Sequence, residues 1–210
     1  MHPVYRALNL LNFSLLPARC VLCQGAGLPE FDLCDGCFSA MPAQPPPIPY
    51  PYGTVYAGFR YQSPIDELIQ GFKFNGQLHF GRLAARLALP ALAQERPDAL
   101  VPVPLHTRRL RERGFNQSLE LAEFWGNRFA LPVLGHALQR HRATRVQSSL
   151  KAAERLSNVA GAFSAKGALP GHVALVDDVY TTGATCHAAA QALLAIGAKR
   201  VDVWCLARVD

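Results

Sequence analysis

From residue 99 onwards the chain alternates short apolar runs with amphipathic segments, which is the pattern of strands joined by crossover helices. The apolar runs that predict strands occupy residues 99–104, 131–134, 172–176 and 201–206. The segments that predict helices begin at residue 114, span residues 152–159, and follow the third strand as an Ala-rich stretch ending near residue 196. We therefore expect an α/β fold built on a parallel sheet.

The preceding segment predicts a hairpin followed by helices. Residues 54–62 alternate small, aromatic and β-branched side chains, and the Ser-Pro pair after them is typical of a helix start. That helix would bury Leu68 and its apolar neighbours. A second helix is expected over residues 82–94, with a kink at Pro90, and the arginine-rich stretch at residues 104–113 is expected to form a loop.

Four cysteines near the start form two C-x2-C pairs separated by ten residues, Cys20 with Cys23 and Cys34 with Cys37. Each pair can direct two thiolates at one ion, and two pairs complete the four-sulfur tetrahedral shell that structural Zn²⁺ prefers. A pair of disulfides is the alternative. We expect a small zinc ribbon that is too short to fold without its metal.

A proline-rich stretch at residues 42–51 separates this ribbon from the rest, because six prolines in ten residues cannot join a helix or a central strand. The predicted parts are an N-terminal helix and zinc ribbon (1–41), a stiff linker (42–51) and the main domain (52–210). Residues 7–17 are apolar, but we expect an amphipathic helix rather than a signal peptide, because the cytosol would keep the following cysteines reduced.

No stretch reaches the roughly 20 apolar residues that span a bilayer, so a soluble, cytoplasmic protein is expected. The net charge is +6, and the window of residues 108–155 concentrates it, with ten Arg and Lys against four Glu. This balance permits a polyanionic partner without requiring one.

The most informative segment is an apolar run, residues 173–176, that leads into Asp177 and Asp178 and then into a small, hydroxyl-rich turn at residues 181–185. A run buried on both faces of a sheet places the acids at the carboxyl edge, where open α/β sheets bind ligands. The turn offers N–H groups and hydroxyls at a helix start, and Gly183 permits close approach, which suits a phosphate monoester.

Two carboxylates would repel that phosphate, so they require another partner. A ribose diol is the natural one, because ionised carboxylates accept hydrogen bonds from its hydroxyls. The segment therefore predicts a site for ribose 5-phosphate. An ordinary strand-to-helix turn capped by threonines is the alternative, and it would leave the paired acids unexplained.

The apolar run, two acids and T-x-G-x-T turn resemble the signature of the type I phosphoribosyltransferases, and the whole chain resembles the ComF family of competence-associated proteins. The matching pieces are the two C-x2-C pairs, FKFNG around Lys73, VPVPLH at 101–106, RERGFNQS at 111–118, Thr144 with Gln147, ERLSNVAGAF at 154–163, and the phosphate loop. The resemblance implies a phosphoribosyltransferase-like parallel-sheet domain with an N-terminal zinc module.

The resemblance also implies phosphoribosyl diphosphate (PRPP) as ligand, with Mg²⁺ on its diphosphate. Asp177 and Asp178 are then the catalytic residues and contact the ribose of PRPP. The turn residues implied to bind the 5-phosphate are Thr181, Thr182, Gly183, Ala184 and Thr185.

In the transferases, a loop after the first core strand binds diphosphate and a flexible basic loop closes over the site; here these are residues 104–113 and 140–155. The arginines would stabilise charge on the departing diphosphate, and closure would exclude water. Lys73 lies between two phenylalanines that can hold its ammonium beside a ligand. Taken without its neighbours, it would be interpreted as an ordinary surface lysine. The residues predicted to contact diphosphate or DNA are Lys73, Arg109, Arg113, Arg145 and Arg155.

Two functional classes follow from the resemblance. One is transfer of the phosphoribosyl group to an acceptor, for which the N-terminal half must supply any hood; ammonia from glutamine is not expected, since no N-terminal cysteine nucleophile domain is present. The other is a non-catalytic, PRPP-regulated protein that binds single-stranded DNA through its basic loops and works with the DNA-uptake machinery.

Overall fold

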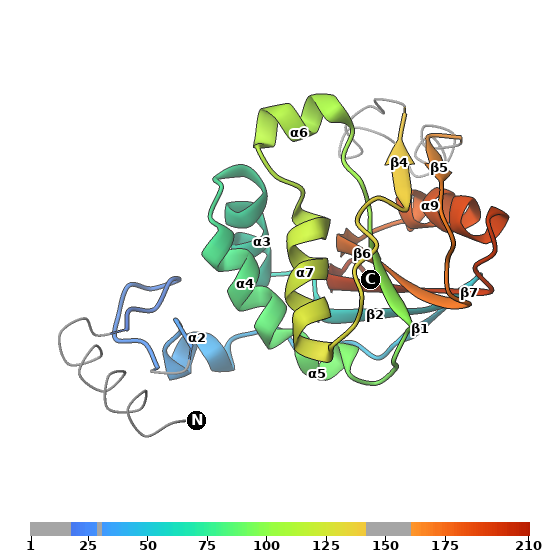
Figure 1. The fold of residues 1–210 in the computed structure, drawn as a ribbon. Coiled ribbons are helices and arrows are strands. Elements are labelled where there is room, and N and C mark those ends of the chain that lie inside the picture. The colour runs from blue at the N-terminus through green and yellow to red at the C-terminus, as the bar shows by residue number, and fades with distance from the viewer. Residues whose placement is uncertain (1–17, 29–30, 142–160) are drawn as a thin grey trace, which may run out of the picture.

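A computed structural model describes residues 18–28, 31–141 and 161–210 (Figure 1). Within this part, five strands form the main sheet in the order β1-β2-β7-β6-β3, and all neighbours are parallel except β1 and β2. These strands are β1 (Ile48–Tyr50), β2 (Gly53–Arg60), β3 (Ala99–Pro102), β6 (His172–Tyr180) and β7 (Arg200–Arg208). A separate antiparallel pair consists of β4 (Leu138–Arg140) and β5 (Phe163–Ala165).

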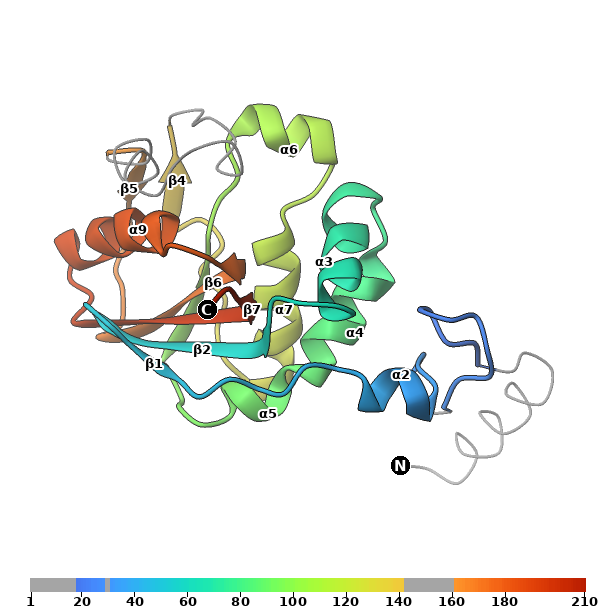
Figure 2. The same cartoon turned by 180° about the vertical axis from the view of Figure 1, so that it is seen from behind.

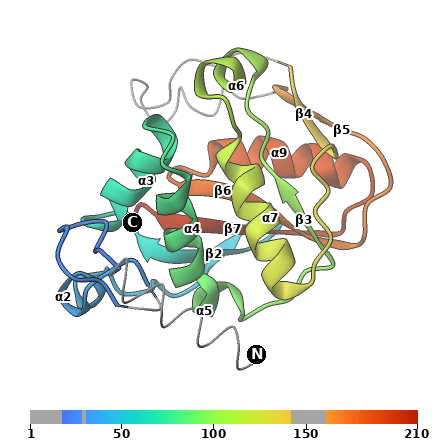
Figure 3. The same ribbon diagram turned by 60° about the vertical axis from the view of Figure 1, so that its left-hand side comes forward.

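Helices cover both faces of the sheet. On one face lie α3, α4, α5 and α7, and on the other lies α9 with the β4–β5 pair (Figures 1 and 3). The described helices are α2 (Asp35–Ser39), α3 (Ile65–Phe74), α4 (Leu78–Leu87), α5 (Leu89–Leu92), α6 (Thr107–Arg113), α7 (Gln117–Phe129) and α9 (Ala184–Ala195). This three-layer arrangement confirms the predicted α/β class with a mostly parallel sheet.

Strand β6 shows why the sheet needs cover on both sides. Val173 and Leu175 belong to the hydrophobic core under α9, whereas Ala174 and Val176 belong to the core under α4 and α7. Because side chains alternate along a strand, an unbroken apolar run is what a strand between two helical layers requires. The strand is longer than the apolar run and continues to Tyr180, so the two acids lie inside it.

Several local predictions were wrong. The arginine-rich stretch expected to be a loop contains α6, which ends at Gly114 with a φ of 84°. Residues 131–134 form no strand and contribute only a bridge between Leu100 and Val133. The kink at Pro90 is a full break, because α4 ends and α5 begins around Ala88. The helix predicted over residues 152–159 lies outside the described residues.

The four-cysteine module packs beside the ends of α3 and α4 (Figure 2). Cys20 and Leu33 are fully buried in the same core as the helices, and the Arg86 guanidinium of α4 lies 4.5 Å from the centre of the Phe31 ring. Such a cation–π contact adds to the apolar packing. The module is therefore joined to the main body by packing as well as by the chain. None of the described helices is long and apolar enough to cross a bilayer.

Candidate ligand-binding site

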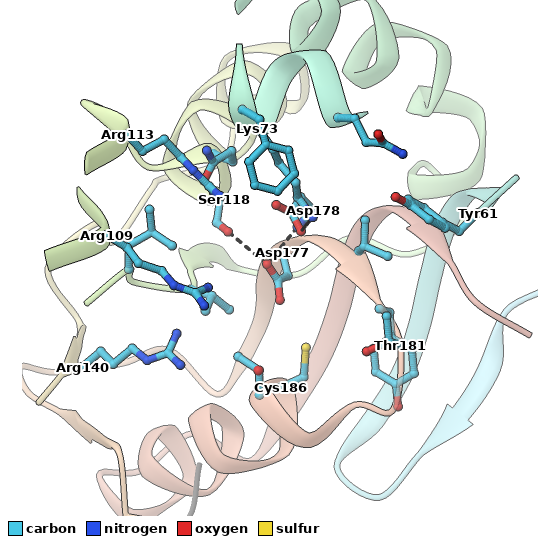
Figure 4. Close-up of a pocket in the computed structure, with 18 of the residues that line it drawn as sticks. Tyr61, Lys73, Arg109, Arg113, Ser118, Arg140, Asp177, Asp178, Thr181 and Cys186 are labelled. Carbon is cyan, nitrogen blue, oxygen red and sulfur yellow. Dashed lines mark hydrogen bonds and ion pairs between the residues drawn. The ribbon is translucent and has the colours of Figure 1, made fainter. Parts of the chain in front are cut away.

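A cavity of about 800 Å³ opens at the carboxyl ends of β3 and β6. The cavity is lined by residues from the end of α3, the start of α7, one side of α6, the last residue of β4 and the turn between β6 and α9 (Figure 4). Parallel strands bring these distant segments to one edge of the sheet, which is where α/β proteins place ligands.

Asp177 and Asp178 form the centre of the cavity (Figure 4). The Ser118 hydroxyl donates to Asp177 Oδ1 over 3.2 Å, and the Asp178 backbone N–H donates to the same oxygen over 2.9 Å. Lys73 Nζ lies 2.8 Å from Asp178 Oδ1, with side chains that are 19% and 13% exposed. The two carboxyls are therefore fixed by different elements before any ligand arrives.

The surroundings of Asp177 change its protonation. Burial, reinforced by the neighbouring charge of Asp178, raises the pKa of Asp177 to about 7, although the Lys73 ammonium opposes the shift. A carboxyl held this way lies near the midpoint of its titration at neutral pH. Perturbed groups of this kind gather at functional sites, so the pKa supports the assignment of this cavity as the candidate site.

The turn between β6 and α9 allows a ligand to approach the backbone closely. Gly183 has a φ of 72°, and a Cβ at this position would collide with the Tyr180 ring, so the turn requires glycine. Helix α9 begins directly afterwards, and its N-cap residue Gly183 has no side chain that could cap the first turn. Its terminal N–H groups are thus directed at the cavity edge, together with Thr181 and Thr185. Thr182, also predicted to bind phosphate, is not among the residues that line the cavity.

Three arginines line the side of the cavity opposite Thr181, with the acids between the two sides (Figure 4). Arg109 and Arg113 come from α6, and Arg140 comes from β4. The sequence singled out the first two by name and placed Arg140 at the start of the basic loop expected over residues 140–155. We call this set the arginine wall.

The electrostatics of the arginine wall favour an anion. Burial lowers the pKa of Arg113 and of Arg140, and the charge of Arg109 lowers both further. Asp178 opposes the shift at Arg113, and Asp177 opposes it at Arg140. Arg109 lies close enough to Arg113 and to Arg140 to lower the pKa of each, so these like charges repel, and a bound anion relieves that repulsion.

Gln117 at the start of α7 is a site residue that the sequence did not reveal. Its side chain lines the cavity and is 1% exposed, yet its Nε2 has no hydrogen-bond acceptor among the described residues. A buried donor without an acceptor costs about 1–3 kcal/mol. The motif GFNQS, which covers Gln117 and Ser118, was the only signal available.

The structure thus gathers Lys73, Arg109 and Arg113 in one cavity with the predicted phosphate loop. The other two basic residues predicted to contact diphosphate or DNA, Arg145 and Arg155, lie outside the described residues, as do Thr144 and Gln147.

The four cysteines of the N-terminal module meet at one point, and all their Sγ atoms lie within 4.8 Å of one another. None is in a disulfide, and Cys23 Sγ lies 3.7 Å from Cys34 Sγ, which matches two corners of a tetrahedron with Zn–S bonds of about 2.3 Å. Burial opposes ionisation of Cys20, but backbone hydrogen bonds lower its pKa to about 6. The cluster therefore fits a zinc ion.

Comparison with known proteins gives relatives over most of the chain. It is 34% identical to the DNA utilization protein YhgH of Escherichia coli K12, in an alignment covering 90% of this chain and 89% of that protein. It is 36% identical to competence protein F of Haemophilus influenzae, covering 70% and 69%, and 30% identical to competence protein ComFC of Streptococcus pneumoniae, covering 71% and 66%.

No protein-family model matches the chain. Among solved structures, a glutamine PRPP amidotransferase from B. subtilis, complexed with ADP and GMP, aligns with 60% of this chain and 25% of its own, at a TM-score of 0.38 and 22% identity.

Proposed function

This chain belongs to the ComF family, and from that premise we propose that its cavity binds PRPP. The observation that carries the proposal is the order of groups across the cavity: an uncapped helix start, then two acids, then an arginine wall. PRPP has the matching order of groups, which is a 5-phosphate, a ribose diol and a diphosphate.

The ribose end of this assignment uses the turn and the acids. The N–H groups at the start of α9 and the hydroxyls of Thr181 and Thr185 donate to the 5-phosphate. Asp177 and Asp178 accept from the ribose hydroxyls, and Ser118 and Lys73 hold them in place for this.

The diphosphate end uses the arginine wall and Gln117. Guanidinium groups suit phosphate oxygens because they donate two parallel hydrogen bonds, and the Gln117 Nε2 gains the acceptor it lacks among the described residues. Carboxylate oxygens beside substrate phosphates also form the donor set that Mg²⁺ prefers, so Asp177 and Asp178 fit that ion. When bound, Mg²⁺ supplies positive charge to the leaving diphosphate.

A cavity of this kind supports phosphoribosyl transfer. The bond from ribose C1 to the diphosphate oxygen breaks with its electron pair on diphosphate, and a bond from C1 to the acceptor's nucleophilic atom forms, after which the acceptor loses a proton. The arginine wall stabilises the charge that develops on the diphosphate, and the fixed acids hold the ribose while C1 carries positive charge.

The four-cysteine cluster holds, in this proposal, one structural Zn²⁺ with no open position, because four thiolates complete its shell. Reduced thiolates of this kind also favour a cytoplasmic location. The three predicted parts, residues 1–41, 42–51 and 52–210, remain our proposed division, with β1 inside the linker as an edge strand.

A second candidate function is the handling of single-stranded DNA in DNA uptake or use, with PRPP as a regulator rather than a substrate. The names of the relatives favour it, and so do Arg108 and Arg111, which lie exposed on α6 outside the cavity. Neutralising phosphates releases counterions, so oligonucleotide affinity should fall steeply as salt rises. Absence of salt-dependent binding would remove this candidate.

The test of the main proposal is calorimetric titration of the zinc-loaded protein with PRPP and Mg²⁺, beside the Asp177→Asn, Asp178→Asn double variant. We expect micromolar binding by the wild type and at least a tenfold loss in the double variant, since each charge-assisted hydrogen bond contributes about 1.5–3 kcal/mol. Equal binding by both proteins would refute the assignment of the acids.

A further inference from the structure

Phe74, the last residue of α3, is the most exposed of the large hydrophobic side chains in the described residues, at 71%. Phe72, two positions earlier, is 1% exposed and contacts the Phe115 ring at 5.5 Å between centroids. Residues two apart on a helix point in different directions, so Phe74 cannot share the core-facing side. The fold therefore gains little from an aromatic ring at this position.

A single exposed phenylalanine is ordinary, but this one lines the ligand cavity. The Arg113 guanidinium of the arginine wall lies 5.3 Å from the centre of its ring, within cation–π range. Gly76, with a φ of 64°, turns the chain immediately after α3 and also lines the cavity. An aromatic ring and a guanidinium together form the kind of surface on which planar heterocycles stack.

Phe74 follows Lys73 in the sequence and therefore lies near the part of the cavity that we assign to the ribose. Lys73, the preceding residue, lies 2.8 Å from Asp178, which our proposed function places on the ribose hydroxyls. Two further polar side chains, Tyr61 and Gln70, line the cavity as well. A hydroxyl and an amide offer both donors and acceptors, which is what the edge of a nitrogen heterocycle requires.

We propose that Phe74, with Arg113, is the stacking surface for a nucleobase that occupies the acceptor end of the cavity. The inference rests on the proposed function, because the bound ribose defines which end is the acceptor end. The nucleobase is either a free base or a base within a single strand that reaches into the cavity, and both present the same planar heterocycle.

The probe is 2-aminopurine, whose fluorescence is quenched by stacking, used as the free base and as one base of a short single strand. Each is titrated with the full, zinc-loaded chain in the presence of PRPP and Mg²⁺. The test variant is Phe74→Leu, which keeps an apolar side chain without a ring. Phe74→Trp keeps stacking, and Phe38→Leu makes the same replacement at an exposed phenylalanine of the four-cysteine module.

We expect quenching of at least one probe by the wild type, Phe74→Trp and Phe38→Leu proteins, and about tenfold weaker binding by Phe74→Leu, in line with the loss of one base stack. Quenching of the free base identifies a small acceptor, and quenching of the strand alone identifies a base in DNA. Absence of quenching, or equal quenching by Phe74→Leu, overturns the inference. Calorimetry of PRPP with the wild type and with Phe74→Leu separates this failure from failure of the PRPP site, because the proposal assigns the ring no direct contact with PRPP.

Discussion

Asp177 combines burial with a close like charge, and this single residue links stability to function. Its raised pKa means that the folded protein holds a proton that the unfolded chain releases between pH 3.8 and about 7. Stability from this residue is therefore present below that window and is lost as pH rises through it. The ionised carboxylate to which we assign the ribose hydroxyls therefore lowers the stability of the ligand-free protein at neutral pH.

Asp177→Asn should therefore stabilise the ligand-free protein at pH 8 by about 1–3 kcal/mol, since the amide keeps the shape and carries no charge. The gain should shrink at pH 5.5, where the wild-type carboxyl is protonated. Urea unfolding of both proteins at the two pH values measures the difference. If the variant were less stable than the wild type at pH 8, the ionised Asp177 carboxylate would not destabilise the folded protein, and the expectation would be wrong.

Gln117 allows a similar separation of stability from binding. Gln117→Met fills nearly the same volume and removes a donor that has no acceptor among the described residues. We expect the free energy of unfolding to stay within about 1 kcal/mol of the wild type, and the affinity for PRPP to fall about tenfold. Chemical unfolding and calorimetry give the two quantities. Unchanged affinity would mean that the amide does not meet the ligand.

Individual site residues could be predicted where their chemistry was evident from the local sequence, as in the acidic pair, the turn and the arginine-rich stretch. Asp177, Asp178 and the turn lie in one contiguous segment, so the sequence alone shows two acids followed by a phosphate-binding type of turn. Gln117 reaches the cavity from α7, and Arg140, expected only as the start of a basic loop, reaches it from β4, so the position of each in the cavity depends on how the sheet and the helices pack. No spacing in the sequence relates such positions, so their roles appear only once the tertiary structure is known.

Among the helices and strands, α6 is an element that the sequence analysis missed, because its residues were expected to form a loop. Residues 107–113 carry four arginines and one glutamate with a single leucine, so no apolar stripe predicts a helix. Instead, local contacts support it: the His106 ring accepts from the Arg108 N–H, Arg108 pairs with Glu112 at 2.9 Å, and Gly114 ends it. By contrast, β6 and α9 were predictable because burial dictates their composition.

The helical form of α6 divides its arginines into two sets. Arg109 and Arg113, four apart, share the cavity side, whereas Arg111 is exposed and does not line the cavity. Arg109→Gln and Arg113→Gln should each weaken the binding of inorganic diphosphate about tenfold, and Arg111→Gln should leave it unchanged. Calorimetric titration with diphosphate and Mg²⁺ compares the three. A loss with Arg111→Gln equal to the others would mean that α6 acts only through its net charge.

At the scale of the whole molecule, the four-cysteine module is part of the main core through Cys20 and Leu33. If the module holds the proposed Zn²⁺, loss of that ion should therefore destabilise the entire chain. We expect one Zn²⁺ per chain, and Cys34→Ser should release it and lower the melting temperature by about 5 °C or more, equivalent to about 2 kcal/mol. Metal analysis and thermal unfolding provide the test. Cys186→Ala is the control that retains zinc, and a zinc-free Cys34→Ser protein with unchanged melting would contradict the coupling.

The central claim is that one cavity binds the two charged ends of PRPP at different places. The most direct test is titration with ribose 5-phosphate and with diphosphate separately, using Thr185→Val for the turn and Arg109→Gln for the arginine wall. We expect Thr185→Val to weaken the binding of ribose 5-phosphate alone and Arg109→Gln to weaken the binding of diphosphate alone, and we expect the wild type to bind PRPP more tightly than either half. If both variants weakened both ligands equally, or neither ligand bound, the proposed arrangement of PRPP in this cavity would be contradicted.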